Sequence, residues 1–298
     1  FGTFNSYVNL YNNQISLGNG VTSNVQFNGI WGGTTNSSMY VYAMYNSVLI
    51  SGTVSSGSLA SYAFHRGNNT TGEISYNLRL TNNVLVNARS GGSSKNYAIA
   101  NEVSGTANGT GWASSGIDYN LLGSSSSNSV GLWAGSNLSI SQWRTLSSGD
   151  NNSYFDLTGT GTNEINISAL FPNYTSGNLE PDNTSNLCWY LNGKGVAGAT
   201  SNNLATDYEG NSRGTTLGFG SDIGAFEFAT STTPPSAVLS GTMAVGQTQT
   251  ITFANKEIGS ITWVSGTLPS ALNIKYYSGV EPPVQTSPIQ YLNTYWDM

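Results

Sequence analysis

The first half of the chain consists of short runs in which hydrophobic and polar positions alternate. A run such as 39–43 or 74–80 leads to an asparagine, an apolar run such as 47–50 follows it, and a third run such as 62–64 comes next. Alternation with a period of two predicts β-strands, and the Gly, Ser, Thr and Asn residues between the runs predict corners. No stretch combines apolar positions at helical spacing with caps, so we expect an all-β protein without helices.

The three runs recur with a nearly constant period. The asparagines before the apolar run are Asn12, Asn46, Asn82 and Asn120, at intervals of 34, 36 and 38 residues. Periods of this size are typical of stacked repeats, and three short strands per repeat predict a three-sided parallel β-helix. Stacking at about 4.8 Å would place the four asparagines in a ladder of side-chain amides. The alternative is that asparagine is merely frequent here and suits turns.

Composition and charge exclude several classes of function. Charged residues make up 8% of the chain, its net charge is −6, and its nine Lys and Arg residues are scattered singly, so no nucleic-acid partner is expected. No run of about 18 apolar residues occurs, which argues against a membrane span. One cysteine and one histidine make neither a disulfide framework nor a metal centre of Cys or His ligands. We expect no cofactor.

The two rare residues each leave an alternative open. Cys188 is interpreted as a small buried hydrophobe, and a reactive thiol is the alternative. His65 is interpreted as a packed or hydrogen-bonded corner residue, and catalysis is the alternative.

After Trp143 the repeat becomes irregular, and three polar motifs follow. They are Gly149-Asp150-Asn151-Asn152-Ser153, Asp207-Tyr208-Glu209-Gly210-Asn211-Ser212-Arg213 and Asp222-Ile223-Gly224-Ala225-Phe226-Glu227. With these motifs the stretch 45–228 resembles the right-handed parallel β-helix domains of large exported bacterial surface proteins. The resemblance implies a right-handed coil that ends at an Asp-Ile-Gly-Ala-x-Glu motif, and it implies no particular activity.

The same residues can be understood as a lock, because the last repeat of a solenoid needs a cover. Arg213 is predicted to contact a carboxylate, and Phe226 or Phe228 is predicted to be buried against the last repeat. The carboxylates available to Arg213 are Asp207, Asp222 and Glu227. The alternative is a calcium loop at 207–211, although the sequence lacks the further carboxylates that such a loop needs.

The C-terminal part has a different pattern. Residues 230–236 are a linker by composition, and 237–298 contain four alternating runs that predict a small β-sandwich-like module. With its final Asn293-Thr294-Tyr295-Trp296-Asp297, this module resembles the immunoglobulin-like modules of exported proteins from bacteria that use type IX secretion. The expected domains are therefore a β-helix at 1–229, a linker at 230–236 and the module at 237–298.

Catalysis on a parallel β-helix would need clustered carboxylates. Residues 1–116 contain only Glu73 and Glu102 as acids. The later acids stand singly and are interpreted as solvated turn residues or caps; they are Asp118, Asp150, Asp156, Glu164, Glu180 and Asp182. We therefore expect no catalytic centre, although a polysaccharide lyase or hydrolase remains an alternative.

The best expectation is an exported rod with a structural or adhesive role. The chain begins at Phe1 within strand-like sequence, which suggests a trimmed piece of a precursor located extracellularly or on the outer cell surface. Its expected partners are further copies of itself, in a filament or surface layer, or surface glycans. A carbohydrate-binding adhesin is a second alternative, with aromatic side chains available for stacking on sugars, among them Trp31, Trp112, Trp133 and Trp143.

Overall fold

The computed structural model of the chain describes residues 6–32, 39–67, 77–93, 95–103, 105, 112, 116–125, 130–156, 167–196, 204–213, 220–253, 256–278 and 294–297. Most regular structure in these residues is β-strand in parallel sheets, and helices are few. This agrees with the predicted all-β class. The expectation of no helix was wrong, because helix α1 spans Ile140–Ser147.

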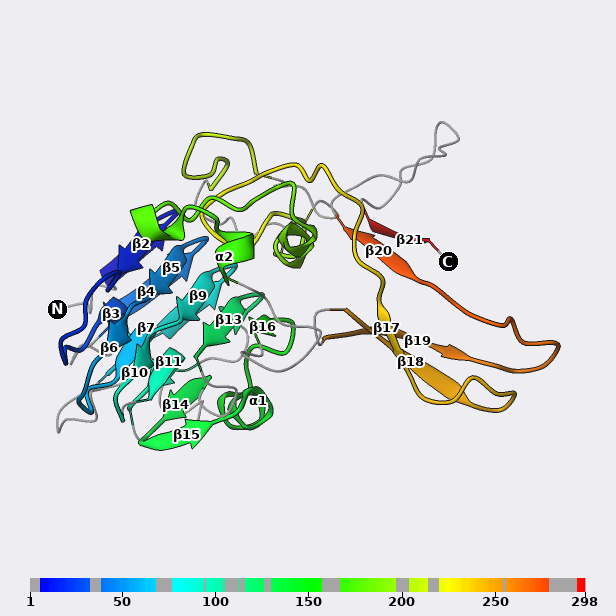
Figure 1. Cartoon of the computed structure of the whole chain (residues 1–298), viewed down its shortest axis with the longest axis horizontal. Coiled ribbons are helices and arrows are strands. Elements are labelled where there is room, and N and C mark those ends of the chain that lie inside the picture. The colour runs from blue at the N-terminus through cyan, green and yellow to red at the C-terminus, as the bar shows by residue number, and fades with distance from the viewer. Residues whose placement is uncertain are drawn as a thin grey trace, which may run out of the picture.

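Three sheets dominate residues 6–156, and Figure 1 shows their strands following one another across the molecule. The first sheet has the order β1 (Ser6–Tyr11), β4 (Met39–Met44), β8 (Asn77–Thr81) and β12 (Ile117–Asp118). The second has the order β2 (Gln14–Leu17), β5 (Ser47–Ile50), β9 (Val84–Asn87), β13 (Leu121–Ser124) and β16 (Tyr154–Asp156). The third has the order β3 (Asn28–Gly32), β7 (Ser61–Arg66), β11 (Asn96–Asn101), β14 (Gly131–Trp133) and β15 (Ser136–Leu138). A short pair joins β6 (Thr53–Val54) to β10 (Ser90–Gly91).

Neighbouring strands in these sheets run parallel and come from successive repeats, except that β15 turns back antiparallel to β14. In the second sheet Ile15, Val48, Leu85 and Leu122 occupy one register position. The last three belong to the main core, and Ile15 packs against it. Because each repeat places its apolar residue beside that of the repeat before it, the sequence period becomes a continuous core.

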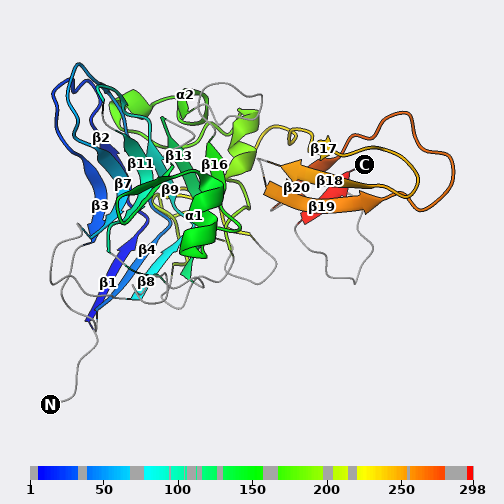
Figure 2. The same ribbon diagram turned by 90° about the horizontal axis from the view of Figure 1, so that it is seen from below.

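The inner strands β5 and β9 of the second sheet are buried on both faces. Its other face carries Leu49, Val84, Val86 and Leu121, which pack against the segment 167–228. Strands that are covered on both faces are expected to be continuously apolar, and both 47–50 and 84–87 are fully buried. The covering segment contains α2 (Ile167–Leu170) and two 3-10 helices, at Tyr174–Ser176 and Asn186–Tyr190. Figure 2 shows β1, β4 and β8 on the opposite side of this body from α2.

Helix α1 covers the last repeat. The Ser139 side chain accepts from the backbone N–H of Gln142, and the Gln142 side chain accepts from the backbone N–H of Ser139, which makes a capping box. Trp143 on the buried side of α1 packs edge-on against Trp112 and Trp133, with ring centroids 5.4 and 5.8 Å away. Gly131 lies under this ring, where a Cβ atom would come within 2.4 Å of Trp143.

The C-terminal strands form antiparallel sheets. One contains β17 (Val238–Ser240), β18 (Thr248–Phe253) and β19 (Lys256–Thr262), and the other pairs β20 (Lys275–Ser278) with β21 (Thr294–Asp297). Phe253 of β18 packs on Tyr190, with ring centroids 5.6 Å apart, so these strands contact the covering segment. Residues 279–293 of the predicted module lie outside the described residues. Within the described part of the chain, no helix combines the length and hydropathy needed to span a membrane.

Candidate functional site

Asparagine side chains form a ladder at the corner between the first and second sheets. Asn13 Nδ2 donates to Asn46 Oδ1 at 2.8 Å, Asn46 Nδ2 to Asn83 Oδ1 at 2.9 Å, and Asn83 Nδ2 to Asn120 Oδ1 at 3.0 Å. The backbone N–H of each donating residue bonds the same oxygen. Asn46, Asn83 and Asn120 are fully buried. Because an unpaired buried amide is costly, the ladder holds each repeat in register with the next.

The ladder corrects the predicted register at two of its four positions. Asn46 and Asn120 lie in it, but Asn12 and Asn82 do not, since the residues that follow them take their places. Asn12 and Asn82 instead hold the covering segment: Asn12 Nδ2 donates to the Thr206 carbonyl, and Asn82 exchanges hydrogen bonds with the backbone of Val196.

The physical reason for this shift is a backbone requirement at the corner. The residue before each ladder asparagine has a left-handed conformation, with φ between 54° and 60° at Asn12, Tyr45, Asn82 and Tyr119. Asparagine tolerates this conformation better than most residues. An Asn-Asn doublet therefore supplies both the left-handed corner residue and the ladder residue after it. Counting from the first asparagine of a doublet gives the corner residue instead of the ladder residue. Alignment on the inward apolar residue, two positions after the ladder, would have given the right register.

The ladder ends at a buried carboxylate. Asp150 Oδ1 accepts from Asn120 Nδ2 at 3.0 Å and from Ser153 Oγ at 2.6 Å, and its Oδ2 accepts from Trp143 Nε1 at 2.9 Å. Burial raises the pKa of Asp150. This residue is a cap, but it is buried rather than solvated, so the Gly-Asp-x-x-Ser motif closes the ladder.

Two other acids from the predicted group cap turns. Asp118 accepts from the backbone N–H of Asn152, and Asp182 accepts from that of Thr184. Glu73 and Glu164 lie outside the described residues.

Arg213 lies at the centre of the predicted lock. Its Nη1 donates to Glu227 Oε2 at 3.0 Å, and its Nη2 donates to Asn12 Oδ1 at 3.1 Å and to the Gly224 carbonyl at 2.9 Å. The guanidinium also lies 4.1 Å from the centre of the Tyr45 ring. Burial lowers the pKa of Arg213, and the charge of Glu227 opposes this effect. Of the three predicted carboxylate partners, Glu227 forms the ion pair.

The lock is not on the last repeat, and that expectation was wrong. Arg213 contacts Asn12 and Tyr45, the backbone N–H of Ala225 donates to Ser47 Oγ at 2.9 Å, and that of Gly224 donates to the Asn82 carbonyl, so the motif holds the first three repeats. Phe226 is buried among the residues that cover the second sheet. The reason is the apolar outer face of this sheet: its burial brings the segment back along the stacked repeats, while α1 covers the last repeat.

Asp207 organises the turn that precedes Arg213. Its Oδ1 accepts from the backbone N–H groups of Glu209 and Asn211, and its Oδ2 accepts from that of Glu227 at 2.7 Å. Burial would raise the pKa of Asp207, but hydrogen bonds from the Glu227 backbone and from Asn211 outweigh it and lower this pKa. The carboxylate is thus occupied by the turn itself, which does not favour the calcium alternative.

Asp222 and Glu227 line a cavity of about 210 Å³, together with Asn192, Gly193 and Phe228 among others. Asp222 Oδ1 accepts from the backbone N–H of Gly193 and its Oδ2 from that of Phe228, at 2.6 and 2.7 Å. Burial, with the charge of Glu227, raises the pKa of Asp222. Both oxygens of Asp222 therefore accept hydrogen bonds from the backbone, and we assign Asp222 and Glu227 a structural role. Among the described residues, no group of three or more His, Cys, Asp or Glu could hold a metal ion.

His65 forms a polar cluster on the third sheet. Its Nε2 lies 2.7 Å from Glu102 Oε2 and its Nδ1 lies 2.8 Å from Asn28 Oδ1, while Tyr62 stacks on the ring. The imidazole is almost completely buried. His65 is thus a packed, hydrogen-bonded residue, as interpreted from the sequence. Cys188 is buried too, and burial raises the pKa of its thiol to about 12, which opposes a reactive thiolate.

Three tyrosine side chains gather on the outer face of the first sheet, one of them exposed and two half-buried. Tyr7 is 57% exposed and stacks on Tyr40 with ring centroids 5.0 Å apart, and Tyr42 is tilted against both. Asn9 and Arg79 are the register partners of Tyr42 on the neighbouring strands. We call these five residues the tyrosine cluster; it has the aromatic and polar groups of a candidate sugar-binding surface. Of the tryptophans that the sequence suggested for stacking on sugars, Trp31 is exposed, whereas three are buried in the core, namely Trp112, Trp133 and Trp143.

A search of protein-family models, of curated proteins and of solved structures found no match to this chain.

Proposed function

We propose that residues 1–229 form a right-handed parallel β-helix, and that this coil is an exported cell-surface rod with a structural or adhesive role and no catalytic centre. The observation that carries the proposal is the buried ladder from Asn13 to Asp150, which ties successive repeats together. A row of satisfied amides suits a protein that must keep its shape rather than change it. Export by a type IX route and an immunoglobulin-like module at 237–298 belong to the same proposal.

The absence of catalysis is supported by how the best candidates are used. Asp150 and Asp222 accept hydrogen bonds through both oxygens, and His65 is enclosed by Tyr62, Asn28 and Glu102. Acid–base catalysis needs a titratable group that can reach a substrate. These groups are instead committed to the fold.

Two measurements test the proposal. Antibodies against the purified chain should label intact producing cells, and external protease should remove the label. Labelling that requires permeabilised cells would contradict the surface location. Release of unsaturated or reducing sugars from polysaccharides by the purified chain would contradict the lack of catalysis.

A second candidate function is glycan binding, which the tyrosine cluster favours. The exposed ring of Tyr7 offers stacking to a sugar, and Asn9 and Arg79, the register partners of Tyr42 in the same cluster, offer hydrogen bonding. On a glycan array, Tyr7→Ala should lose about tenfold or more of any binding. Tyr208→Ala, which removes a similarly exposed tyrosine elsewhere, is the matched control. Equal glycan binding by the Tyr7→Ala and Tyr208→Ala variants would show that the tyrosine cluster is not the glycan-binding surface.

A further inference from the structure

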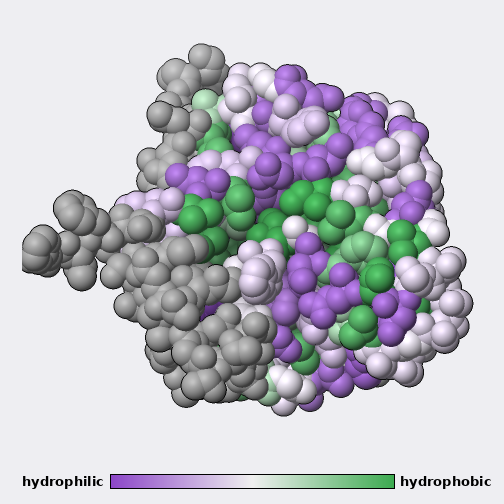
Figure 3. All heavy atoms as spheres, turned by 90° about the vertical axis from the view of Figure 1, so that its left-hand side faces the viewer, coloured by the Kyte–Doolittle hydropathy of each residue, from purple (hydrophilic) through white to green (hydrophobic). Residues whose placement is uncertain are grey.

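The coil has an open end at its first repeat. Among the described residues, strands β1, β2 and β3 are the outermost strands of their sheets. Val8 is 37% exposed, whereas Val41, its register partner in the next repeat, is 4% exposed. Figure 3 looks onto this side of the molecule and shows hydrophobic side chains gathered among polar ones. The apolar core therefore reaches the surface here.

This end lacks the features that usually keep sheet edges apart. Natural edge strands carry charged residues or prolines that prevent pairing with another chain. Residues 1–64 contain neither a charged residue nor a proline. The net charge of −6 therefore arises entirely from later residues. Strands β1, β2 and β3 therefore bring no like charge of their own to a contact between copies, and the ion pair of Arg213 and Glu227 reaches this repeat through Asn12.

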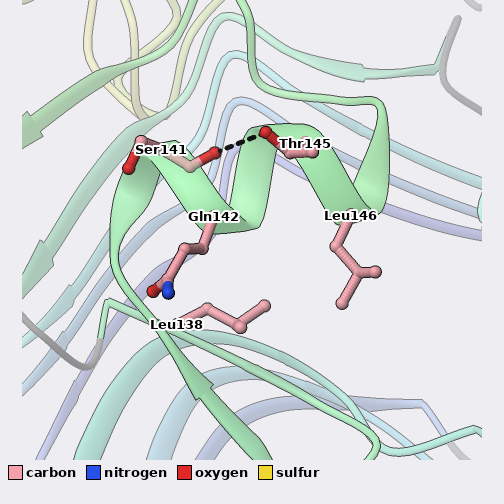
Figure 4. Close-up of a pocket in the computed structure, with 5 residues that line it drawn as sticks. All are labelled: Leu138, Ser141, Gln142, Thr145 and Leu146. Atoms are coloured by element: carbon pink, nitrogen blue, oxygen red, sulfur yellow. Dashed lines mark hydrogen bonds between the residues drawn. The ribbon is translucent and has the colours of Figure 1, made fainter.

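The opposite end of the third sheet likewise has an outermost strand, exposed apolar surface and few charged residues. Strand β15 is the outermost strand there, and α1 lies next to it. A hollow of about 330 Å³ between them is lined by Leu138, Ser141, Gln142, Thr145 and Leu146, as Figure 4 shows. Leu146 is 44% exposed. Between Ala134 and Gly149 the single charged residue is Arg144, whose guanidinium donates to the carbonyls of Asp150 and Ser153.

From these two ends we infer that copies of the chain stack head to tail. The edge of β3 pairs with the edge of β15 of the next copy, so that the third sheet continues from one molecule into another. Val8 and its partly buried neighbours Leu10 and Ile15 then face Leu146, which buries apolar surface that each end exposes by itself. Because the two contacting surfaces differ, the contact repeats and produces a filament instead of a closed dimer. The inference deepens the proposed function and rests on it, since it names the partner of the rod as a second copy.

The test uses one charge at each end of the whole chain. Val8→Lys and Leu146→Lys should each weaken association about a hundredfold or more, because an unpaired charge would be buried at the contact. Sedimentation velocity over a range of concentrations measures the association, and electron microscopy shows the filaments. Val264→Lys adds the same charge at a residue that is 81% exposed elsewhere, and it should assemble like the unmodified chain.

A mixture of the two end variants distinguishes the possible arrangements. In head-to-tail stacking each variant keeps one intact end, so the equimolar mixture should form dimers and nothing larger. A mixture that stays monomeric would overturn the inference, and so would assembly of Leu146→Lys at the unmodified level, which indicates head-to-head pairing. Thermal melting confirms that each variant folds, and Trp31→Lys at the exposed indole replaces Val8→Lys if that variant does not. An unmodified chain that stays monomeric would overturn the inference, while surface labelling would still decide the proposed function.

Discussion

At the scale of single residues, the molecule relies on buried amides and carboxylates whose hydrogen bonds are satisfied internally. The ladder asparagines are the main example, since each donates twice to the next repeat through Nδ2 and the backbone N–H. In a chain with 8% charged residues, such amides take over the role that ion pairs have elsewhere. Their value depends on burial, because a partner left unpaired in the core loses water as well as its bond.

Replacement of a ladder asparagine should therefore be costly. Asn83→Ala removes the acceptor of two donors from Asn46 and leaves the Asn120 oxygen with one donor fewer. We expect the free energy of unfolding to fall by about 3 kcal/mol, as measured by denaturant titration. Asn273→Ala, at an exposed position near the C-terminus, is the control and should change little. Equal stability of the two variants would contradict the ladder's role.

The turn acid Asp207 should make stability depend on pH in a defined direction. Its pKa is lower in the folded chain than the ordinary value of 3.8, so the folded state keeps the carboxylate charged where the unfolded state protonates it. Its contribution is fully present above pH 3.8 and is lost as pH falls through the lowered pKa. Asp207→Asn should destabilise the chain by about 2 kcal/mol at neutral pH. The difference from the unmodified chain should narrow below pH 3.8, and a constant difference would contradict this mechanism.

At the scale of elements, helix α1 shows how a local sequence signal can define the end of the stacked repeats. The capping box at Ser139 and Gln142 satisfies N–H groups at the helix start, and Trp143 anchors the helix on the last repeat. The helix is only eight residues long, so propensity would not stabilise it in isolation. Packing against the coil and the cap together hold it in place.

Loss of the Ser139 cap should destabilise helix α1 and lower the stability of the chain. Ser139→Ala removes the side-chain acceptor for the Gln142 N–H and should lower the free energy of unfolding by about 1 kcal/mol. Ser139→Asp keeps an acceptor at the helix N-terminus and should retain most of the stability. Thermal melting of both variants measures the contrast. A similar loss in both would show that the hydroxyl does not act as a cap.

At the scale of the whole molecule, the covering segment links the last repeat to the first ones. The chain proceeds from the first repeat to α1, and the segment 167–228 then returns along the second sheet to contact Asn12, Ser47 and Asn82. Early and late parts of the sequence thus stabilise each other, which a solenoid of independent repeats would not show. The covering segment thus holds the first repeat from the side, and the head-to-tail contact that we infer uses the end of this repeat.

The lock should protect the first repeats more than the last one. Arg213→Ala leaves the Glu227 carboxylate without its ion-pair partner and should lower the free energy of unfolding by about 3 kcal/mol. Hydrogen exchange should accelerate at β2 and β5, whereas β14 should keep its protection. Faster exchange at β14 alone would instead indicate a lock on the last repeat. Arg79→Ala, which removes an arginine from the first sheet, serves as the control.

The sequence by itself determined the strand pattern, the repeat period and the identity of the residues in the lock. Alternation of apolar and polar residues and the spacing of repeats are visible in the sequence without knowledge of long-range contacts, because each depends on a regular pattern along the chain. Only the tertiary structure decided that Asn13 and Asn83 take the ladder positions, because an Asn-Asn doublet satisfies the local corner in either register.

Tertiary structure also decided where the irregular segment goes and which aromatic side chains reach the surface. The contact between Arg213 and Asn12 joins residues 201 positions apart, and no period in the sequence connects them. Trp31 and Trp112 have similar side chains, yet the first is exposed and the second is buried. Such outcomes depend on which apolar face the returning chain covers, and this is set by burial over the whole coil rather than by any local pattern.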